Sequence, residues 1–425
     1  MKPKLAIIGT GISGMACGHF LQNDFDIHLY EQNDHIGGHS LTAEADESGR
    51  PIPIDMGFMV FNKKTYPNLT RLFDELNVPY KKSNMSFSVQ HLPMGLEYCG
   101  SGLNHLFGQR KNIFNLRHWR MLFQINRFNK EAINALESGQ YDSLSLEEYV
   151  KARGYGEDFF ELYIIPMSSA IWSTPPELML KFPATTLLRF FHNHGFLGLK
   201  TQHQWLTPDG GSKEYVKRLT APFKNRIQTQ NAIQKVQRVG NRAVIHTQNG
   251  TSDEYDKVIL ASHADQSLNL LDCPDDEEKA VLSNFRYQHN VGTLHTDASS
   301  MPKNKLCWAS WNYRIKRNAE GKLSPRTLYW MNKLQNVSDK INYFVSINGE
   351  DEVNPDCIIK QVPFDHPLFD KAAVDAQPKL HQLNRRSSGQ KIYFCGSYFK
   401  YGFHEDALNS AMTLCETILG RPLWN

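Results

Sequence analysis

The chain has 425 residues, a formal net charge of +3 and a hydrophobic content of 40%. That length suits two or three domains of a globular protein. The nearly balanced charge argues against nucleic-acid binding, and no apolar run reaches the roughly 18 to 20 residues that span a bilayer. Its 7 cysteines are scattered without a C-x-x-C pair, and no H-E-x-x-H motif is present. We therefore expect a cytoplasmic protein without a metal.

The first predicted element is a strand over residues 5–8 that runs into a glycine-rich turn, residues 9–14. A helical stretch follows, and a second apolar run, residues 25–30, ends at Glu31. A strand, a G-x-G-x-x-G turn, a helix, a strand and a terminal acid are typical of a dinucleotide-binding βαβ unit. Its helix N-terminus offers free N–H groups to phosphates.

Each conspicuous residue of this unit has a predicted task. Gly9 permits the sharp turn, Gly11 lets the backbone approach a pyrophosphate, and Gly14 allows close packing of helix and strand. Glu31 can accept both hydroxyls of an adenosine ribose. The same carboxylate would repel a 2′-phosphate, which disfavours NADP.

The residues after Glu31 favour FAD over NAD. The pair Gly37-Gly38 follows, then His39, and glycine pairs permit close backbone approach and unusual dihedral angles. Such a pair suits a cofactor that continues past its pyrophosphate toward a buried ring. Gly57 adds another glycine within a second apolar run.

These motifs resemble the flavin-containing amine oxidase superfamily, which includes phytoene-desaturase-like enzymes. Its fingerprint is the glycine turn, an acid, five residues, then Gly-Gly and usually Arg; here His39 replaces that Arg. The sequence is most similar to bacterial relatives found beside cyclopropane-fatty-acid synthases, in which segments like residues 57–62 and 402–406 recur. The resemblance extends from residue 4 to residue 419.

Two later regions carry the same resemblance. Residues 208–211 look like the mid-chain Gly-Gly element, and a strand opening at Ile233 would bring a backbone group to the adenine edge. Residues 392–407 are similar to the last strand and the flavin-facing loop, and a helix over residues 406–419 would point its positive end at the flavin. Phe403 stands where amine oxidases carry one aromatic of their substrate cage.

The resemblance implies an α/β fold with an FAD-binding Rossmann-like domain of the glutathione-reductase type and a discontinuous α+β substrate domain. We expect the FAD-binding domain over 1–62, 205–285 and 390–425, and the substrate domain over 63–204 and 286–389. The cofactor is expected to be non-covalent FAD. The residues expected to contact it are Gly9, Gly11, Ile12, Ser13, Gly14, Glu31, Gln32, Gly37, Gly38, His39, Ser40, Met56, Gly57, Phe58, Ile233, Gly396, Ser397, Gly402, Phe403, His404 and Ala407.

Two middle segments each allow two interpretations. Residues 98–130 carry six Lys or Arg, no acid and many interleaved aromatics, which fits either a membrane-facing amphipathic helix or a core helix with a basic solvated face. Residues 182–205 are apolar enough to line a hydrocarbon channel or to form ordinary core. Aromatic strands around 308–313 and 329–331 are expected above the flavin.

The leading functional hypothesis is an FAD-dependent oxidase or desaturase-like dehydrogenase. It would move a hydride from a C–H bond of a hydrophobic substrate, such as an unsaturated, methylated or cyclopropane-type fatty acyl chain, to flavin N5, with oxygen or a quinone-like carrier as electron acceptor. The alternatives are an amine oxidase acting on a primary amine or polyamine, and a non-catalytic FAD-binding partner of a lipid-modifying methyltransferase. His404 is the candidate catalytic base, although its backbone could equally be what contacts the flavin.

Overall fold

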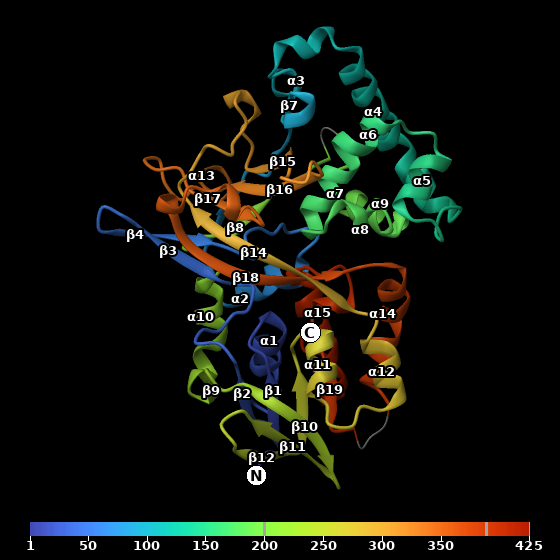
Figure 1. Cartoon of the computed structure of the whole chain (residues 1–425). Coiled ribbons are helices and arrows are strands. Elements are labelled where there is room, and N and C mark those ends of the chain that lie inside the picture. Colours follow the sequence, from blue (N-terminus) through green and yellow to red (C-terminus); the bar gives the residue numbers. More distant parts are fainter. Residues whose placement is uncertain (199–200, 387–389, 425) are drawn as a thin grey trace.

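The computed structural model describes residues 1–198, 201–386 and 390–424. Its central element is a five-stranded parallel sheet with the strand order β19-β13-β1-β2-β9. Segments far apart in the sequence therefore build one sheet, in the lower half of Figure 1. The strands are β1 (Lys4–Ile8), β2 (Asp26–Tyr30), β9 (Ile227–Gln228), β13 (Lys257–Leu260) and β19 (Ile392–Phe394).

Both faces of this sheet are covered, which explains the uninterrupted apolar run at the start of the chain. Alternate side chains of a strand point to opposite faces, so Leu5 and Ile7 pack in one core and Ala6 and Ile8 in another. The first core is closed by α1 (Ile12–Leu21), α10 (Lys213–Thr220) and α15 (His404–Leu419). The second is closed by β10 (Ile233–Val239), β11 (Arg242–Thr247), β12 (Ser252–Tyr255), α11 (Ala264–Leu270), α12 (Asp276–Leu282) and α14 (Lys371–Leu383).

A seven-stranded mixed sheet, in the order β18-β14-β17-β16-β15-β6-β7, lies in the upper half of Figure 1. Its strands are β6 (Phe87–His91), β7 (Leu96–Cys99), β14 (Arg286–His295), β15 (Trp311–Arg317), β16 (Leu323–Trp330), β17 (Phe344–Ile347) and β18 (Ile358–Leu368). Two small ribbons pair β3 (Thr42–Glu47) with β4 (Arg50–Asp55) and β5 (Tyr80–Lys82) with β8 (Leu206–Pro208). The long strands β14 and β18 run along the boundary between the halves.

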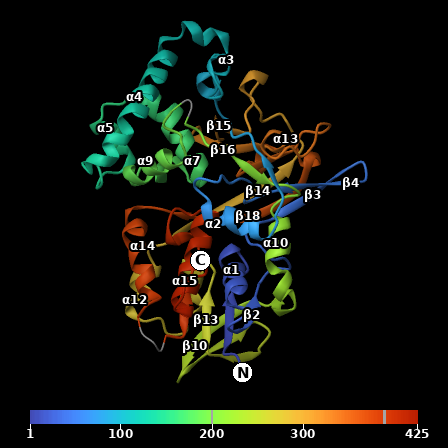
Figure 2. The same ribbon diagram turned by 180° about the vertical axis from the view of Figure 1, so that it is seen from behind.

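Helices flank this second sheet, and all but the first of them close a separate aromatic core around Phe128, Phe159 and Phe191. They are α3 (Leu103–Leu106), α4 (Leu116–Ser138), α5 (Leu146–Ala152), α6 (Glu157–Phe159), α7 (Ile165–Trp172), α8 (Pro176–Met179) and α9 (Ala184–Asn193). The turn between α6 and α7 is a π-helix over Phe160–Ile164. The segment of α3 and α4 projects from the top of the molecule in both views (Figures 1 and 2). Among the described residues, no helix has the length and apolar character needed to cross a membrane.

The observed elements confirm most of the expected ones. The α/β fold class is as predicted, the last helix begins two residues earlier than expected, at His404, and a strand opens at Ile233. Trp119, Leu122 and Phe123 lie on one helix, α4. Trp308 and Met331 lie just outside β15 and β16. Trp308 follows a short helical turn at Lys305–Cys307, and Met331 is the first residue of α13 (Met331–Leu334).

The division into two discontinuous domains stays a prediction. Two helices in segments assigned to the substrate domain pack with the parallel sheet instead. The buried side chains of α2 (Pro67–Glu75) lie in the core of α1 and α15, and those of α14 lie in the core of β10 and β11.

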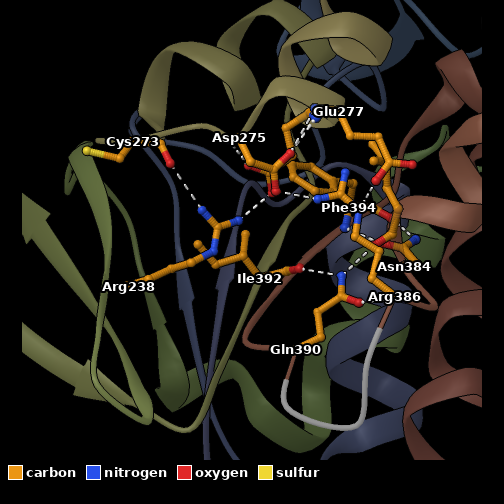
Figure 3. A network of polar contacts seen from close by, with 11 residues as sticks. Arg238, Cys273, Asp275, Glu277, Asn384, Arg386, Gln390, Ile392 and Phe394 are labelled. Atoms are coloured by element: carbon orange, nitrogen blue, oxygen red, sulfur yellow. Dashed lines mark hydrogen bonds and ion pairs between the residues drawn. The ribbon is translucent and has the colours of Figure 1, made fainter.

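A polar network closes the outer edge of the parallel sheet beside β19 (Figure 3). The amide of Asn384 donates to the carbonyl of Phe394 at 2.8 Å and accepts from its N–H at 2.9 Å. The guanidinium of Arg386 pairs with Asp275 and Glu277 at the start of α12. The side chain of Asn384 thus occupies the hydrogen-bonding edge that another strand would otherwise use.

The contact of α1 with β1 yields a stability prediction. A Cβ at Gly14 would overlap the carbonyl oxygen of Gly9, whereas a Cβ at Gly11 would meet no protein atom within 4 Å. A Gly→Ala change inside a helix raises the free energy of unfolding by about 0.5–1 kcal/mol. Overpacking of a closely packed site lowers it by about 1–3 kcal/mol. Gly14→Ala should therefore lower the free energy of unfolding of the apoprotein in urea, while Gly11→Ala should leave it within about 0.5 kcal/mol. Equal stability of both variants would contradict the close contact.

Candidate functional site

A cavity of about 800 Å³ is lined by residues from both halves of the molecule, and that volume is within the usual range for ligand sites. Most of the residues predicted to contact a cofactor line it; Gly14, Ser40 and Met56 do not. Gly14 packs against the backbone of Gly9, Met56 packs in the core of β3 and β4, and Ser40 lies behind His404. The structure thus brings the predicted cofactor-contacting residues from residues 9–58, from residues 396–407 and at Ile233 to one cavity.

The glycine turn forms one wall of this cavity. Gly9 has a φ of +101° and donates its N–H to the carbonyl of Tyr30 at 2.9 Å. Gly11 is the N-cap residue of α1, and no protein atom lies within 4 Å of the place where its Cβ would stand. A flat backbone surface at a helix N-terminus is the arrangement that accepts phosphate oxygens, so the turn fits a dinucleotide.

Glu31 is buried beside the turn. Its carboxylate accepts hydrogen bonds from the hydroxyl of Thr10 at 2.6 Å and from the N–H and the amide side chain of Asn33 at 3.0 and 2.9 Å. These donors hold the carboxylate in place at the carboxyl end of β2 (Asp26–Tyr30), where it lines the cavity. A fixed acceptor at that point fits a ribose diol.

The second glycine pair packs directly over the turn. Gly37 and Gly38 both have positive φ, and the N–H of Gly37 donates to the carbonyl of Thr10 at 3.0 Å. A Cβ at Gly38 would come within 3.2 Å of the α-carbon of Gly11. His39 therefore follows a segment that rests on the glycine turn.

The N-terminus of α15 forms the opposite wall. The carboxylate of Asp406 accepts from the backbone N–H of Phe403 at 3.1 Å and so caps its own helix. Glu405 instead caps α2, because it accepts from the N–H groups of Asn68 and Leu69 at 3.0 and 2.9 Å. Burial raises the pKa of Asp406 to about 6. Both acids are therefore fixed by the fold rather than directed at a substrate.

His404 is held by three neighbours. Its Nε2 lies 2.8 Å from the hydroxyl of Ser40 and 3.0 Å from that of Tyr215, and its ring stacks on Phe58 at 3.8 Å. Burial, and secondarily the nearby His39, lowers the pKa of His404 to about 3. A neutral ring with so low a pKa is a weak proton acceptor, so the geometry favours a positioning role, and a catalytic role for His404 stays a prediction.

The other end of the cavity is apolar and aromatic. Phe403 lies 5.1 Å from Phe190 and 6.1 Å from Trp172, measured between ring centroids. Trp311 and Tyr329, from the expected aromatic strands, stack at 5.7 Å. Further apolar side chains of this end are Met85, Ile171, Phe196, Trp205 and Phe369. The expected apolar segment 182–205 thus contributes both to the cavity wall and to the core around Leu187 and Leu188.

The lining has a notable charge pattern. Among the described residues, it includes five histidines and the carboxylates of Glu31 and Asp365, but no lysine or arginine. The described part of the chain also has no cluster of three potential metal-ligating side chains. Cys395 is buried near Cys17, with the sulfurs 3.9 Å apart, and is not part of the lining.

Several lining residues were missed by sequence reasoning. His263 and Ser262 follow β13, and the carboxyl ends of parallel strands are where ligands bind, so their position could have indicated them. His366, Tyr66 and Trp172 gave no local signal, because they reach the cavity only through the packing of distant elements.

The comparisons with known proteins agree with this geometry. The chain is 29% identical over 85 residues to a lysine-specific histone demethylase 1B homolog of Caenorhabditis elegans, a match that spans 20% of this chain and 10% of that protein. Over 98% of its length it superimposes on 99% of a putative protoporphyrinogen oxidase from Exiguobacterium sp. 255-15, at 16% identity and a TM-score of 0.69.

Two further solved structures share the fold. Putrescine oxidase bound to putrescine matches 99% of this chain and 100% of its own at 13% identity and a TM-score of 0.68. A fatty acid isomerase from P. acnes that produces CLA matches 96% of this chain and 97% of its own chain, at 16% identity and a TM-score of 0.66. The family model described as flavin containing amine oxidoreductase matches residues 12–332. The chain therefore belongs to the flavin containing amine oxidoreductase family, which implies an FAD-dependent oxidoreductase.

Proposed function

We propose that the protein oxidises a C–H bond of a hydrophobic substrate, with a fatty acyl chain of the unsaturated, methylated or cyclopropane type as the favoured class. Bound FAD would supply the electron chemistry by accepting a hydride at N5 and passing the electrons to oxygen or a quinone-like carrier. The observation that supports this best is the aromatic end of the cavity. There Trp172, Phe190 and Phe403 leave an apolar compartment beside the helix N-terminus of α15.

The same compartment bears on the amine alternative. The cavity lining has no lysine among the described residues, whereas many amine oxidases use a lysine to hold a water near the flavin. Aromatic side chains could still hold a neutral amine, so amine oxidation is the second candidate. Structural likeness to both a putrescine oxidase and a fatty acid isomerase shows the shared fold only.

FAD is proposed to bind without a covalent link. Cys395, at the end of β19, is buried against Cys17 and lies outside the cavity lining. The fit of the cofactor rests on the open space at Gly11, on the fixed carboxylate of Glu31 and on the free N–H groups at the start of α1.

We also propose that residues 98–130 contact the inner face of a membrane. Apart from Met1, the four most exposed large apolar side chains of the described residues all lie here: Leu103 at 74%, Phe114 at 88%, Leu116 at 81% and Phe123 at 66% exposure. Single exposed apolar side chains are common, but a cluster of this kind marks an interaction surface. The cluster belongs to the projecting segment of α3 and α4.

The segment that carries this cluster is also positively charged. Arg117 and Arg127 pair with Asp158 and Glu131, whereas the other cations of the segment form no ion pair with a described residue; these are Arg110, Lys111, Arg120 and Lys130. A hollow of about 320 Å³, lined in part by Lys111 and Arg117, adjoins the exposed Phe114. Cations around apolar side chains fit a surface of anionic lipid.

The cofactor prediction uses two substitutions. Gly11→Val should abolish FAD binding, because a side chain would fill the space that faces the phosphates, while the unfolding of the apoprotein stays close to wild type. Glu31→Ala should weaken FAD binding by about 1.5–3 kcal/mol through lost charged hydrogen bonds. Acid precipitation should release yellow FAD to the supernatant. Full FAD occupancy in Gly11→Val would show that the turn does not bind the cofactor.

The substrate prediction uses anaerobic bleaching of the flavin. Acyl lipids should bleach it, and Ile171→Trp, which fills the apolar compartment, should lower kcat/KM for them about tenfold, equal to about 1.4 kcal/mol. Ile171→Val is the matched control and should keep both FAD content and rate. Bleaching by putrescine but not by acyl lipids would favour the amine candidate. A bound flavin that neither class reduces would favour the non-catalytic partner of a methyltransferase.

The membrane prediction uses co-sedimentation with liposomes. Binding should require anionic lipid and weaken with salt, because each cation near such a surface adds about 1 kcal/mol. Changing the four cations without an ion pair to Gln should remove the dependence of liposome binding on anionic lipid. Changing Phe114→Ser together with Leu116→Ser should remove the part of the binding that resists salt. Four exposed lysines elsewhere serve as the control; these are Lys64, Lys151, Lys322 and Lys379. Wild-type protein that does not co-sediment with anionic liposomes at low salt would disprove the membrane contact.

A further inference from the structure

The proposed FAD would bring two negative charges into a cavity whose described lining residues include no permanent cation. The pyrophosphate of FAD is a dianion, yet no lysine or arginine of the described residues lines the cavity, and Glu31 and Asp365 add negative charge. Helix N-termini and backbone N–H groups supply only partial positive charge. Histidine is therefore the residue type in the lining that can supply a full positive charge near neutral pH.

Three histidines gather beside the glycine turn. The ring of His39 lies 5.3 Å from that of His366 and 6.3 Å from that of His263, measured between centroids. They come from three separate elements: the loop after Gly38, β18 (Ile358–Leu368) and the residue before α11 (Ala264–Leu270). All three line the cavity. We call them the histidine cluster.

The histidine cluster lies at the end of the cavity formed by the glycine turn, where the phosphates are proposed to bind. The segment before His39 rests on the turn, since a Cβ at Gly38 would come within 3.2 Å of Gly11. The backbone carbonyl of His39 accepts from the N–H of Phe58 at 2.8 Å. His39 is thus anchored beside the backbone that fits the phosphates.

A chain of amides fixes the tautomer of His366. The side-chain oxygen of Asn348 accepts from the backbone N–H of Val291 at 2.8 Å, so its NH₂ is the group that donates to the oxygen of Asn290 at 2.6 Å. The NH₂ of Asn290 then donates to Nδ1 of His366 at 2.7 Å. Because Nδ1 is an acceptor, neutral His366 carries its proton on Nε2.

The free protein holds the cluster neutral. Burial, and after it the charge of the neighbouring histidines, lowers the pKa of His39 to about 4 and that of His366 to about 3. Burial also lowers the pKa of His263. A nearby carboxylate, Asp365, acts in the opposite direction.

Other titratable groups surround the cluster. From β14, the ring of Tyr287 stacks on His263 at 4.2 Å. From α11, Asp265 lies near Tyr287, and burial raises its own pKa. From α15, His404 lies close enough for a positive charge on His39 to lower its pKa. From β14, the Nδ1 of His289 lies 2.8 Å from the carboxylate of Asp365 on the exposed side.

We propose that the histidine cluster takes up a proton when FAD binds and so neutralises part of the charge of its pyrophosphate. This inference rests on the proposed FAD site. The phosphates stabilise the imidazolium, so the pKa of the cluster is higher in the complex than in the free protein. Between these two pKa values FAD binds more tightly as the pH falls, and above the higher value the affinity no longer depends on pH. The fully ionised phosphate diesters of FAD do not titrate in this range.

The test measures proton uptake directly. Apoprotein is titrated with FAD by calorimetry between pH 5.5 and 8.5, in buffers of different ionisation enthalpy. We expect net uptake of up to one proton and a Kd that falls by as much as about tenfold for each pH unit lowered. ADP-ribose has the same pyrophosphate diester without the flavin ring and should show the same uptake.

Variants locate the proton. His39→Gln should reduce the uptake, whereas His39→Arg supplies a permanent cation and should bind FAD tightly with a flatter pH dependence. His192→Gln, at an exposed position outside the cavity, is the matched control and should behave like wild type.

The outcomes separate this inference from the cofactor assignment. FAD binding that is equally tight at every pH and involves no proton uptake would overturn the inference and leave the FAD site intact. Uptake with FAD but not with ADP-ribose would place the proton at the flavin end, near His404, and would also overturn it. Failure of FAD to bind at any pH would overturn both.

Discussion

The close contact between Gly9 and Gly14 determines where the rest of the site can form. It brings the first turn of α1 against the end of β1, because Gly14 has no side chain that would overlap the carbonyl oxygen of Gly9. The carboxyl ends of β1, β2 and β13 then open on one edge of the parallel sheet. Ligands of open α/β sheets bind outside that edge. The segment of Gly37 and Gly38 can pack on the turn because the turn presents bare backbone at Gly11.

Buried carboxylates join distant segments around this edge. Asp55 accepts from the N–H of Ser212 at 2.8 Å and from the amide of Gln335 at 2.7 Å, and so connects β4 to the start of α10 and to the segment after α13. Gly211 must lack a side chain, since a Cβ would come within 2.6 Å of Thr42. Burial of a charge costs free energy unless it is fully hydrogen-bonded. Such residues therefore fix the relative positions of the two halves rather than take part in chemistry.

The sequence predicted the cofactor half far better than the substrate half, for a physical reason. Glycine turns and the acid at Glu31 act through local backbone geometry, so their spacing is visible in the chain. His366 and Trp172 reach the cavity through sheet register and helix packing, which no local pattern records. The role of His404 was uncertain for the same reason, because its partners Ser40 and Tyr215 are 364 and 189 residues away.

The two ends of the cavity differ in their chemistry: one is polar and contains histidines, and the other is apolar and aromatic. At the polar end, the side chains that could neutralise charge are histidines, so the charge of that region depends on what is bound. At the apolar end, the rings of Phe190 and Phe403 stack with their centroids 5.1 Å apart, and the proposed acyl chain would displace water from this aromatic lining. Water exclusion strengthens every electrostatic interaction in a site. In the proposed reaction, a hydride would leave an allylic carbon without a strong base, which agrees with a His404 that is neutral and already hydrogen-bonded.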